Sequence, residues 1–384
     1  MGEIFSALVS FLIIIGIVVA VHEFGHFITA RVLGVQVHEF AIGMGPVIKQ
    51  FEQLKEVKKD NQTYKYRTLW SLRAFPLGGF CRLAGMGAED EETASTVDSK
   101  DKKSKSFSMG EEYDDQPVIP GMGFNEQSAW KRFFILLNGS VCNVILALIL
   151  VTALLSGRGV LNMNDTRIGT LLDGFPAQSV GFQPGDRITE VNGVRVTEWR
   201  EMQTRLREAA TYGDVTFTIE RGNSVLTITT ALSFSEEHGN PMLGITPAMI
   251  GMPLHESLVF SVFHIRDMTI IMLMGIRDMV TGRGEVDVTG PIGIASMSGQ
   301  AMRDGVWSFV TLMALISLNI GLLNLFPIPA LDGGRIIFVF LEMIFRRRLP
   351  EKIENYIHTA GAVLLISLIV LITWQDIYNI FFAG

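Results

Sequence analysis

An apolar run that ends in ionisable side chains constrains this chain more than any other feature. Residues Ile4 to Val21 carry no charge and are followed at once by the segment HEFGH, His22 to His26. In hydrocarbon, ionisable side chains are costly and usually face a bundle interior or a wet cavity. On a helix, histidines four residues apart share one face and can reach one metal ion, while Glu23 can hold and deprotonate water. The run therefore predicts hydrolysis inside a membrane.

The composition agrees with a membrane protein. Of the 384 residues only 18% are charged, and the mean hydropathy is positive. Four segments approach the ~20 residues that cross about 30 Å of hydrocarbon. They are Ile4–Ala30, Phe133–Leu155, Val306–Phe326 and Ile357–Trp374. We therefore expect a multi-pass α-helical membrane protein with four transmembrane helices.

The distribution of Lys and Arg predicts the topology. Because neither residue precedes the first span, we expect a retained helix with its N-terminus outside the cytoplasm. The connection from Arg31 to Arg132 and the short loop Arg346–Arg348 are basic, which favours the cytoplasmic side for both. Both termini are then extracytoplasmic, and HEFGH lies towards the cytoplasmic half. A net charge of −7 without a basic tract gives no support for binding nucleic acid.

The connections between the spans differ in character. Ala74–Leu83 is apolar but too short to span, so it fits a re-entrant or interfacial β-hairpin, or a small cytoplasmic sheet. Gly87 to Gln116 is polar and charged, and we expect a flexible linker there. Cys81 and Cys142 fall in different segments, which argues against a structural disulfide.

The segment after the second span is soluble in character. Thr166–Leu172, Arg187–Val196, Val215–Glu220 and Val225–Ala231 are expected strands, and a helix is expected to start near Thr197. Leu258 to Val280 is amphipathic, which suits a helix on the membrane surface or one packed on the soluble domain. We expect transmembrane helices in residues 1–32, 129–156, 305–348 and 349–384, of which the first carries HEFGH and the third carries LDGG. Between them we expect a cytoplasmic or re-entrant β-hairpin region with a flexible linker in 33–128, a small β-rich domain in 157–252 and an extracytoplasmic amphipathic segment in 253–304.

Two His and a Glu do not complete a catalytic zinc site, which usually has three protein ligands. The outstanding candidate for the third is Asp332, in the segment NLFPIPALDGGR from Asn324 to Arg335. Its two prolines break the helix, and a broken helix at membrane depth is tolerated only where protein or a wet cavity surrounds it. On the expected topology the third span ends on the cytoplasmic side, level with His26.

With these motifs the chain resembles the site-2 protease family of intramembrane zinc metalloproteases, in its bacterial RseP-like branch. The resemblance rests on HEFGH, on the hairpin Phe75–Phe80, on Gly290–Ile294 and on NLFPIPALDGG from Asn324 to Gly334. HExxH alone is moderately specific. Together with LDGG in a second span it is highly specific.

The resemblance implies a role for each motif residue. His22, His26 and Asp332 would bind one Zn²⁺, Glu23 would act as general base, and Asn324 would hold the backbone of the unwinding substrate. An interhelical hydrogen bond is the alternative for Asn324. The family implies single-span membrane proteins as substrates, typically anti-sigma factors or remnant signal peptides, and a bacterial cytoplasmic (inner) membrane location in contact with lipid.

Two further expectations concern substrate binding. An unwound substrate is predicted to pair with an edge strand of the Phe75–Leu83 hairpin. Gly181–Ile188 and the following Glu190–Gly193 resemble one extracytoplasmic PDZ domain, which would bind a peptide near Arg167–Gly169 or act as a size gate. At the second span the sequence departs from the Gly-Pro that often precedes Asn in the family, so no role is assigned to Asn143.

Other functions remain open from sequence. A membrane metal-binding or transport protein is the alternative, because His and Asp in spans also mark ion pathways. A catalytically silent PDZ scaffold is a third possibility. The four histidines without a ligand-spaced partner, namely His38, His238, His255 and His358, are expected at the surface or as caps.

Overall fold

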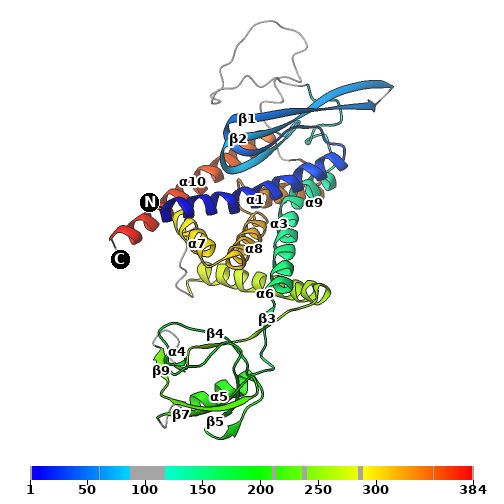
Figure 1. Ribbon diagram of the computed structural model, residues 1–384. Coiled ribbons are helices and arrows are strands. Elements are labelled where there is room, and N and C mark those ends of the chain that lie inside the picture. The colour runs from blue at the N-terminus through cyan, green and yellow to red at the C-terminus, as the bar shows by residue number, and fades with distance from the viewer. Residues whose placement is uncertain are drawn as a thin grey trace. The chain divides into compact units, whose positions relative to one another are not determined.

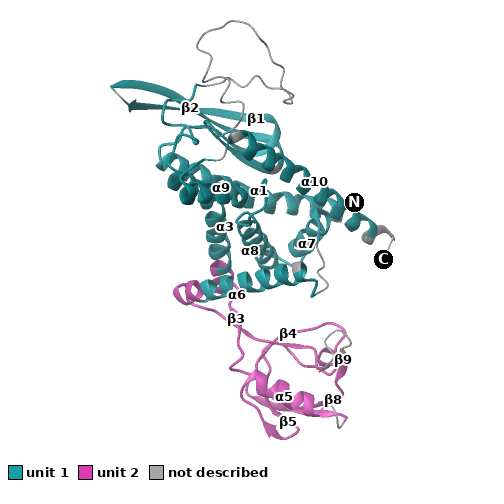
Figure 2. Ribbon diagram, turned by 180° about the vertical axis from the view of Figure 1, so that it is seen from behind, with its two compact units in different colours: residues 1–151, 260–384 teal, residues 152–259 magenta. Residues whose placement is uncertain are grey.

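The computed structural model describes residues 2–59, 61–86, 117–209, 213–235, 240–283, 289–348 and 350–382. These residues form two compact units, a larger one of residues 1–151 and 260–384 and a smaller one of residues 152–259 (Figure 2). The expected linker, 87–116, lies outside the described residues.

Five helices in the described part of the chain are long and apolar enough to cross a membrane. They are α1 (Gly2–Val32), α3 (Ala129–Gly157), α6 (Leu254–Thr281), α8 (Val306–Leu323) and α10 (Glu351–Phe382) (Figure 1). Four of them coincide with the expected spans. The fifth, α6, covers the amphipathic segment, and its length and composition allow a span as well as the expected surface helix.

Helix α1 buries a stripe of side chains that winds gradually around the helix. Ser10, Ile14, Val18, His22 and His26 follow one another at intervals of four and are all buried. Large apolar side chains elsewhere on the helix, such as Leu8 and Ile13, are exposed. A step of four residues turns the position by only about 40° around a helix, so neighbouring members of the stripe share a face. Ile14 and Val18 pack against α7 and α8, and the histidines follow towards α3 and Asp332. The histidines thus continue a packing face into the interior.

Helix α7 (Pro291–Arg303) lies within the expected division 253–304, after the amphipathic stretch Leu258 to Val280, and it was not predicted. Gly290-Pro291 gives the sequence signal, since proline is favoured in the first turn of a helix. The Asp376 carboxylate of α10 accepts hydrogen bonds from the backbone N–H groups of Gly290 (3.2 Å) and Gly293 (3.0 Å). This carboxylate satisfies otherwise unpaired donors at the start of α7.

Strands β1 (Val37–Lys59) and β2 (Gln62–Leu83) form a long hairpin, with Asn61 in the left-handed conformation at its turn. The first part of β1, Glu39 to Ile42, pairs on one side with Gly79–Arg82 and on the other with Leu69–Leu72. A buried ion pair between Glu39 and Arg73 (2.7 Å) braces this part of the sheet. The hairpin is therefore longer than the expected segment Ala74–Leu83, which forms the last part of β2, and Gly79–Leu83 lies at an edge of the described sheet.

The smaller unit contains the expected strands. Its main sheet has the order β6-β5-β7-β8, formed by Val194–Arg195, Arg187–Val191, Val215–Arg221 and Ser224–Thr230. Three shorter pairs are β4 (Ile168–Leu171) with β11 (Ile245–Pro247), β3 (Val160–Leu161) with β12 (Met249–Ile250), and β9 (Ser233–Ser235) with β10 (Asn240–Met242). Helix α4 (Pro176–Ser179) is short, and α5 (Trp199–Ala209) buries Trp199, Met202 and Leu206 in the core.

A buried carboxylate joins two parts of this unit. Arg221, at the end of β7, donates two hydrogen bonds to Asp186, of 2.7 and 2.8 Å. Burial by itself would raise the pKa of the Asp186 carboxyl, but the hydrogen bonds from Arg221 and from the backbone N–H of Gln183 outweigh it and hold that pKa below its usual range. The turn before β5 is thereby fixed to β7.

Candidate metal centre

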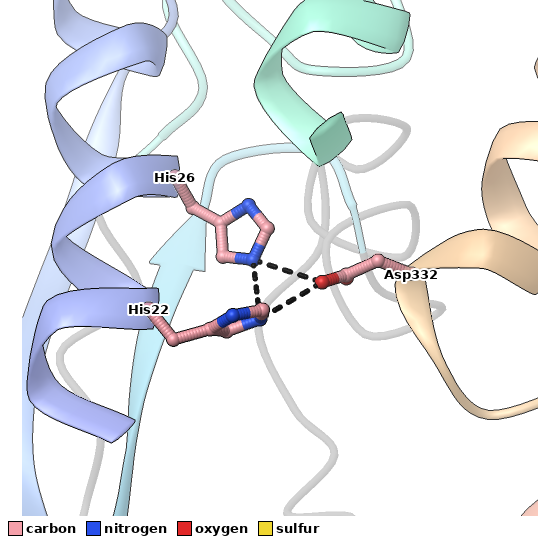
Figure 3. A group of neighbouring side chains, drawn as sticks. All are labelled: His22, His26 and Asp332. Carbon is pink, nitrogen blue, oxygen red and sulfur yellow. Dashed lines mark hydrogen bonds and ion pairs between the residues drawn. The ribbon is translucent and has the colours of Figure 1, made fainter. Parts of the chain in front are cut away.

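Three side chains from two helices converge in the larger unit (Figure 3). His22 and His26 come from α1, and Asp332 is the first residue of α9 (Asp332–Phe345). Asp332 Oδ2 lies 2.9 Å from His22 Nε2 and 3.1 Å from His26 Nε2, and the two Nε2 atoms are 3.2 Å apart. The structure thus brings together the three residues expected to share a metal. They are the one group of this kind among the residues described.

A hydrogen bond to α3 fixes the orientation of the His26 ring. Its Nδ1–H donates to the backbone carbonyl oxygen of Ile135 on α3, at 2.8 Å. A hydrogen bond at Nδ1 fixes the tautomer, so Nε2 keeps its lone pair for a metal.

The His22 ring has a partner that the sequence did not reveal. Its Nδ1 lies 3.4 Å from the side-chain nitrogen of Asn143 on α3, while the buried Asn143 Oδ1 has no hydrogen-bond partner among the described atoms. Nitrogen and oxygen of an amide are assigned from the hydrogen-bond network. Exchanging them lets Oδ1 accept the Nδ1–H of His22 and satisfies both groups. A polar Asn inside an apolar span was the available signal.

Close backbone approach brings α3 to the two histidines. A Cβ atom at Gly139 would lie 2.4 Å from His26 Nε2 and 2.9 Å from His22 Cε1. A Cβ atom at Gly25 would lie 2.3 Å from the carbonyl oxygen of Asn138. Neither position has room for a side chain, so the two glycines set the distance between α1 and α3 at the site.

Asp332 is placed by a break between two helices. Helix α8 ends at Leu323 and α9 begins at Asp332, with Pro327 and Pro329 between them. Proline cannot donate a backbone hydrogen bond, and this interrupts the helix. The Gly333 N–H donates to the carbonyl oxygen of Asn324 at 2.6 Å, and a Cβ atom there would lie 2.1 Å from the carbonyl oxygen of Phe326. The helix is therefore interrupted between α8 and α9, as the prolines in the sequence predicted, and the backbone of this segment makes close contacts with itself.

A cavity of about 280 Å³ adjoins the three side chains. Glu23 and Asn324 line it together with Cys81 and Leu83 at the edge of the hairpin. The backbone of Cys81 lies beside the Glu23 carboxylate. The cavity is therefore lined by α1, by the segment between α8 and α9, and by the edge of the β1–β2 sheet.

The donor set fits zinc. Two imidazole nitrogens and one carboxylate oxygen are typical ligands of catalytic zinc, which keeps its fourth position open. Tetrahedral ligands about 2.0 Å from a metal are roughly 3.3 Å apart, close to the 2.9–3.2 Å between the atoms here.

The remaining expected residues differ in outcome. His255 is exposed, as predicted. The surface prediction is wrong for His38 and His358, which are buried. His38 contacts the Gln36 side chain, and His358 accepts a hydrogen bond from the backbone N–H of Ala330, which is distant in sequence. His238 lies outside the described residues. Cys81 and Cys142 are free thiols, which confirms that they form no disulfide.

The smaller unit has a groove of about 200 Å³ between α5 and the segment Pro241–Ile245. Trp199, Gln203 and Arg207 line it from the helix. The site expected near Arg167–Gly169 lies on the strand that pairs with β11 and does not line this groove.

Comparison with known proteins decides the family. The model of peptidase family M50 matches residues 10–368. The chain belongs to this family. A Fusobacterium nucleatum protein assigned by name to the zinc metalloproteases is 32% identical over 96% of this chain and 98% of its own length. Zinc metalloprotease RasP of Bacillus licheniformis is 27% identical over 98% of this chain and all of its own length.

Family membership establishes that the chain is a zinc metalloprotease of the membrane, and the predicted site-2 protease resemblance is confirmed. A PDZ domain of an SdrC-like protein from Listeria monocytogenes covers 22% of this chain and 87% of its own, at 23% identity and a TM-score of 0.20.

The close packing of Gly139 against the two histidine rings can be tested by substitution. Gly139→Ala should weaken zinc binding about 10- to 100-fold, because the new methyl group displaces the His26 ring. Zinc competition titration of the purified protein measures the change. The matched control is Gly275→Ala on α6, where nothing lies within 4 Å of the new Cβ. Equal affinities in the two variants would contradict the packing argument.

Proposed function

We propose that this protein is an intramembrane endopeptidase that cuts the transmembrane segments of single-span substrates, of the anti-sigma factor or remnant signal peptide kind. The observation that carries the proposal is the convergence of His22, His26 and Asp332 beside Glu23, on helices apolar enough to span a membrane. A protease site on such helices can reach a peptide bond that is itself in the bilayer.

In this proposal His22, His26 and Asp332 hold the zinc ion. Zinc, when bound, lowers the pKa of water and polarises a carbonyl group. Glu23 lines the same cavity, removes the proton from the attacking water and returns it to the leaving amine. In this proposal the backbone N–H of Cys81, which lies beside the Glu23 carboxylate, orients that carboxylate for the transfer.

Asn324 is proposed to hold the substrate backbone. It caps the C-terminus of α8 and lines the cavity, and no side-chain hydrogen bond is recorded for it among the described residues. The lack of an interhelical partner in this set supports the substrate role over the alternative. Its amide offers both a donor and an acceptor to a peptide group that has lost its helical partners.

The edge segment Gly79–Leu83 is proposed to bind the substrate as an added strand. It pairs with β1 on one side, and Cys81 and Leu83 line the cavity. Adding a strand satisfies the backbone groups of an unwound segment, which is costly to leave unpaired in hydrocarbon.

Strand pairing predicts a period of two along the substrate. N-methylation of single backbone amides near the scissile bond should block cleavage at alternate residues and be tolerated at those between, because neighbouring N–H groups of a strand point in opposite directions. Cleavage assays on a set of singly methylated transmembrane peptides measure this. Sensitivity without a two-residue period would argue against strand addition.

We further propose that the smaller unit is a PDZ-type domain, as the Gly181–Gly193 motif suggests, and that its groove binds peptide. Gln203→Trp should fill the groove and weaken binding of a fluorescent peptide library to the full-length protein at least tenfold. Thr204→Trp, an exposed position outside the groove, is the control. If no peptide binds the wild type, the domain acts as a size gate instead.

The proposed location is the bacterial cytoplasmic membrane, with both termini and the PDZ-type domain outside the cytoplasm. The basic residues of the 31–132 connection and of Arg346–Arg348 support this orientation. The centre then lies towards the cytoplasmic half.

Glu23→Gln tests the chemistry. In proteoliposomes with a single-span substrate, the variant should retain zinc and lose cleavage by at least 10²-fold, because the amide cannot accept the water proton. The zinc content of wild type and variant is measured on the same samples. A variant that still cleaves refutes Glu23 as the base. If neither protein cleaves but both move zinc across the bilayer, the transport alternative holds.

A further inference from the structure

The loop that leads into Asp332 contains a residue in an unusual conformation. Ala330 has a φ of 80°, in the left-handed region that residues with a side chain rarely adopt. It lies two positions before Asp332. Such a conformation persists only where surrounding contacts impose it, so something must hold this loop.

One contact from another helix meets the loop at this residue. The backbone N–H of Ala330 donates to His358 Nδ1 on α10 at 3.0 Å. Apart from the contacts of the Asp332 carboxylate with the two histidines, the other hydrogen bonds described for residues 324–334 join backbone atoms within that segment or connect it to the end of α8. The His358 bond therefore differs from them in tying the loop to a separate element.

The environment of His358 fixes its role as an acceptor. The residue is 8% exposed, and its ring lies edge-on to Phe338 of α9, with centroids 5.6 Å apart. Because Nδ1 accepts a hydrogen bond, the ring is neutral and carries its proton on Nε2. A cationic ring would offer two donors and lose the bond.

Helix α10 touches the same loop at a second point. A Cβ atom at Gly361 would lie 2.3 Å from Pro329 Cβ and 2.7 Å from its carbonyl oxygen. Gly361 and His358 are three residues apart, on one face of α10. This face of α10 therefore contacts the backbone of Pro329 and Ala330 directly.

We propose that His358 is a positioning residue of the metal centre. By accepting the Ala330 N–H, it holds the loop in the conformation that aims Asp332 at His22 and His26. The inference rests on the proposed role of Asp332 as a ligand. It makes α10 a structural part of the centre although the helix contributes no ligand.

Paired substitutions test the hydrogen bond separately from packing. Asn places its oxygen where Nδ1 stands, whereas Gln places its oxygen nearer Nε2. We expect His358→Asn to bind zinc within about threefold of the wild type, and His358→Gln and His358→Ala to bind it about 10- to 100-fold more weakly. Zinc competition titration of the full-length protein in nanodiscs gives the affinities, and Val363→Ala, at an exposed position of α10, controls for the effect of an alanine substitution in this helix away from the loop.

A second substitution should rescue the first. Glycine adopts positive φ without strain, so Ala330→Gly in the His358→Ala background should restore most of the zinc affinity. Thermal unfolding of the zinc-free proteins is measured in parallel, because a purely structural defect would not respond to Ala330→Gly.

The outcomes separate this inference from the proposed function. Wild-type zinc affinity in His358→Ala refutes the positioning role. So does a loss of affinity that is equally large in His358→Asn and that Ala330→Gly does not correct. If Asp332→Ala binds zinc as tightly as the wild type, the proposed ligand set itself is wrong. Weak binding by Asp332→Ala with normal binding by His358→Ala overturns only the role of His358.

Discussion

The structure depends on the burial of two imidazoles and a carboxylate among apolar helices. Ionisable groups in such surroundings are costly unless they face one another or an ion. His22, His26 and Asp332 meet this requirement within 3.2 Å of each other. The backbone features around them follow from that contact: the Gly25–Gly139 approach lets α3 pass close to the rings, and the break after α8 turns Asp332 towards them.

The same contact explains why elements distant in sequence crowd around one small cavity. Helix α3 supplies the Ile135 carbonyl and the Asn143 amide, which orient the two rings. The hairpin supplies the edge beside Glu23, and α10 supplies His358 beneath the loop. The groups from α3 contact the two rings directly, whereas His358 contacts the loop that precedes Asp332, so the elements that surround the centre are distributed over most of the larger unit.

The sequence predicted those parts of this arrangement that depend on local pattern. Apolar length located the spans, a spacing of four placed both histidines on one face, and prolines with glycines marked the broken segment before Asp332. Contacts between residues distant in sequence could not be predicted from local pattern. Nothing local distinguishes His358 from a surface histidine, and Asn143 in an apolar helix could equally bond any neighbour. Helix α7 was missed because its glycines and serines give little apolar periodicity, although they allow close packing on α1.

The buried stripe on α1 has a consequence for how this helix can move. If α1 rotated about its axis by the angle between consecutive residues, each side chain would turn by about 100°. Such a turn would bring the exposed Ile13 to the packing face and carry His22 away from Asp332. Sliding by one full turn would instead exchange His22 for Val18. Under the proposed ligand set, metal binding therefore depends on the rotational register of the first helix, and a bound ion would hold the helix at a single angle.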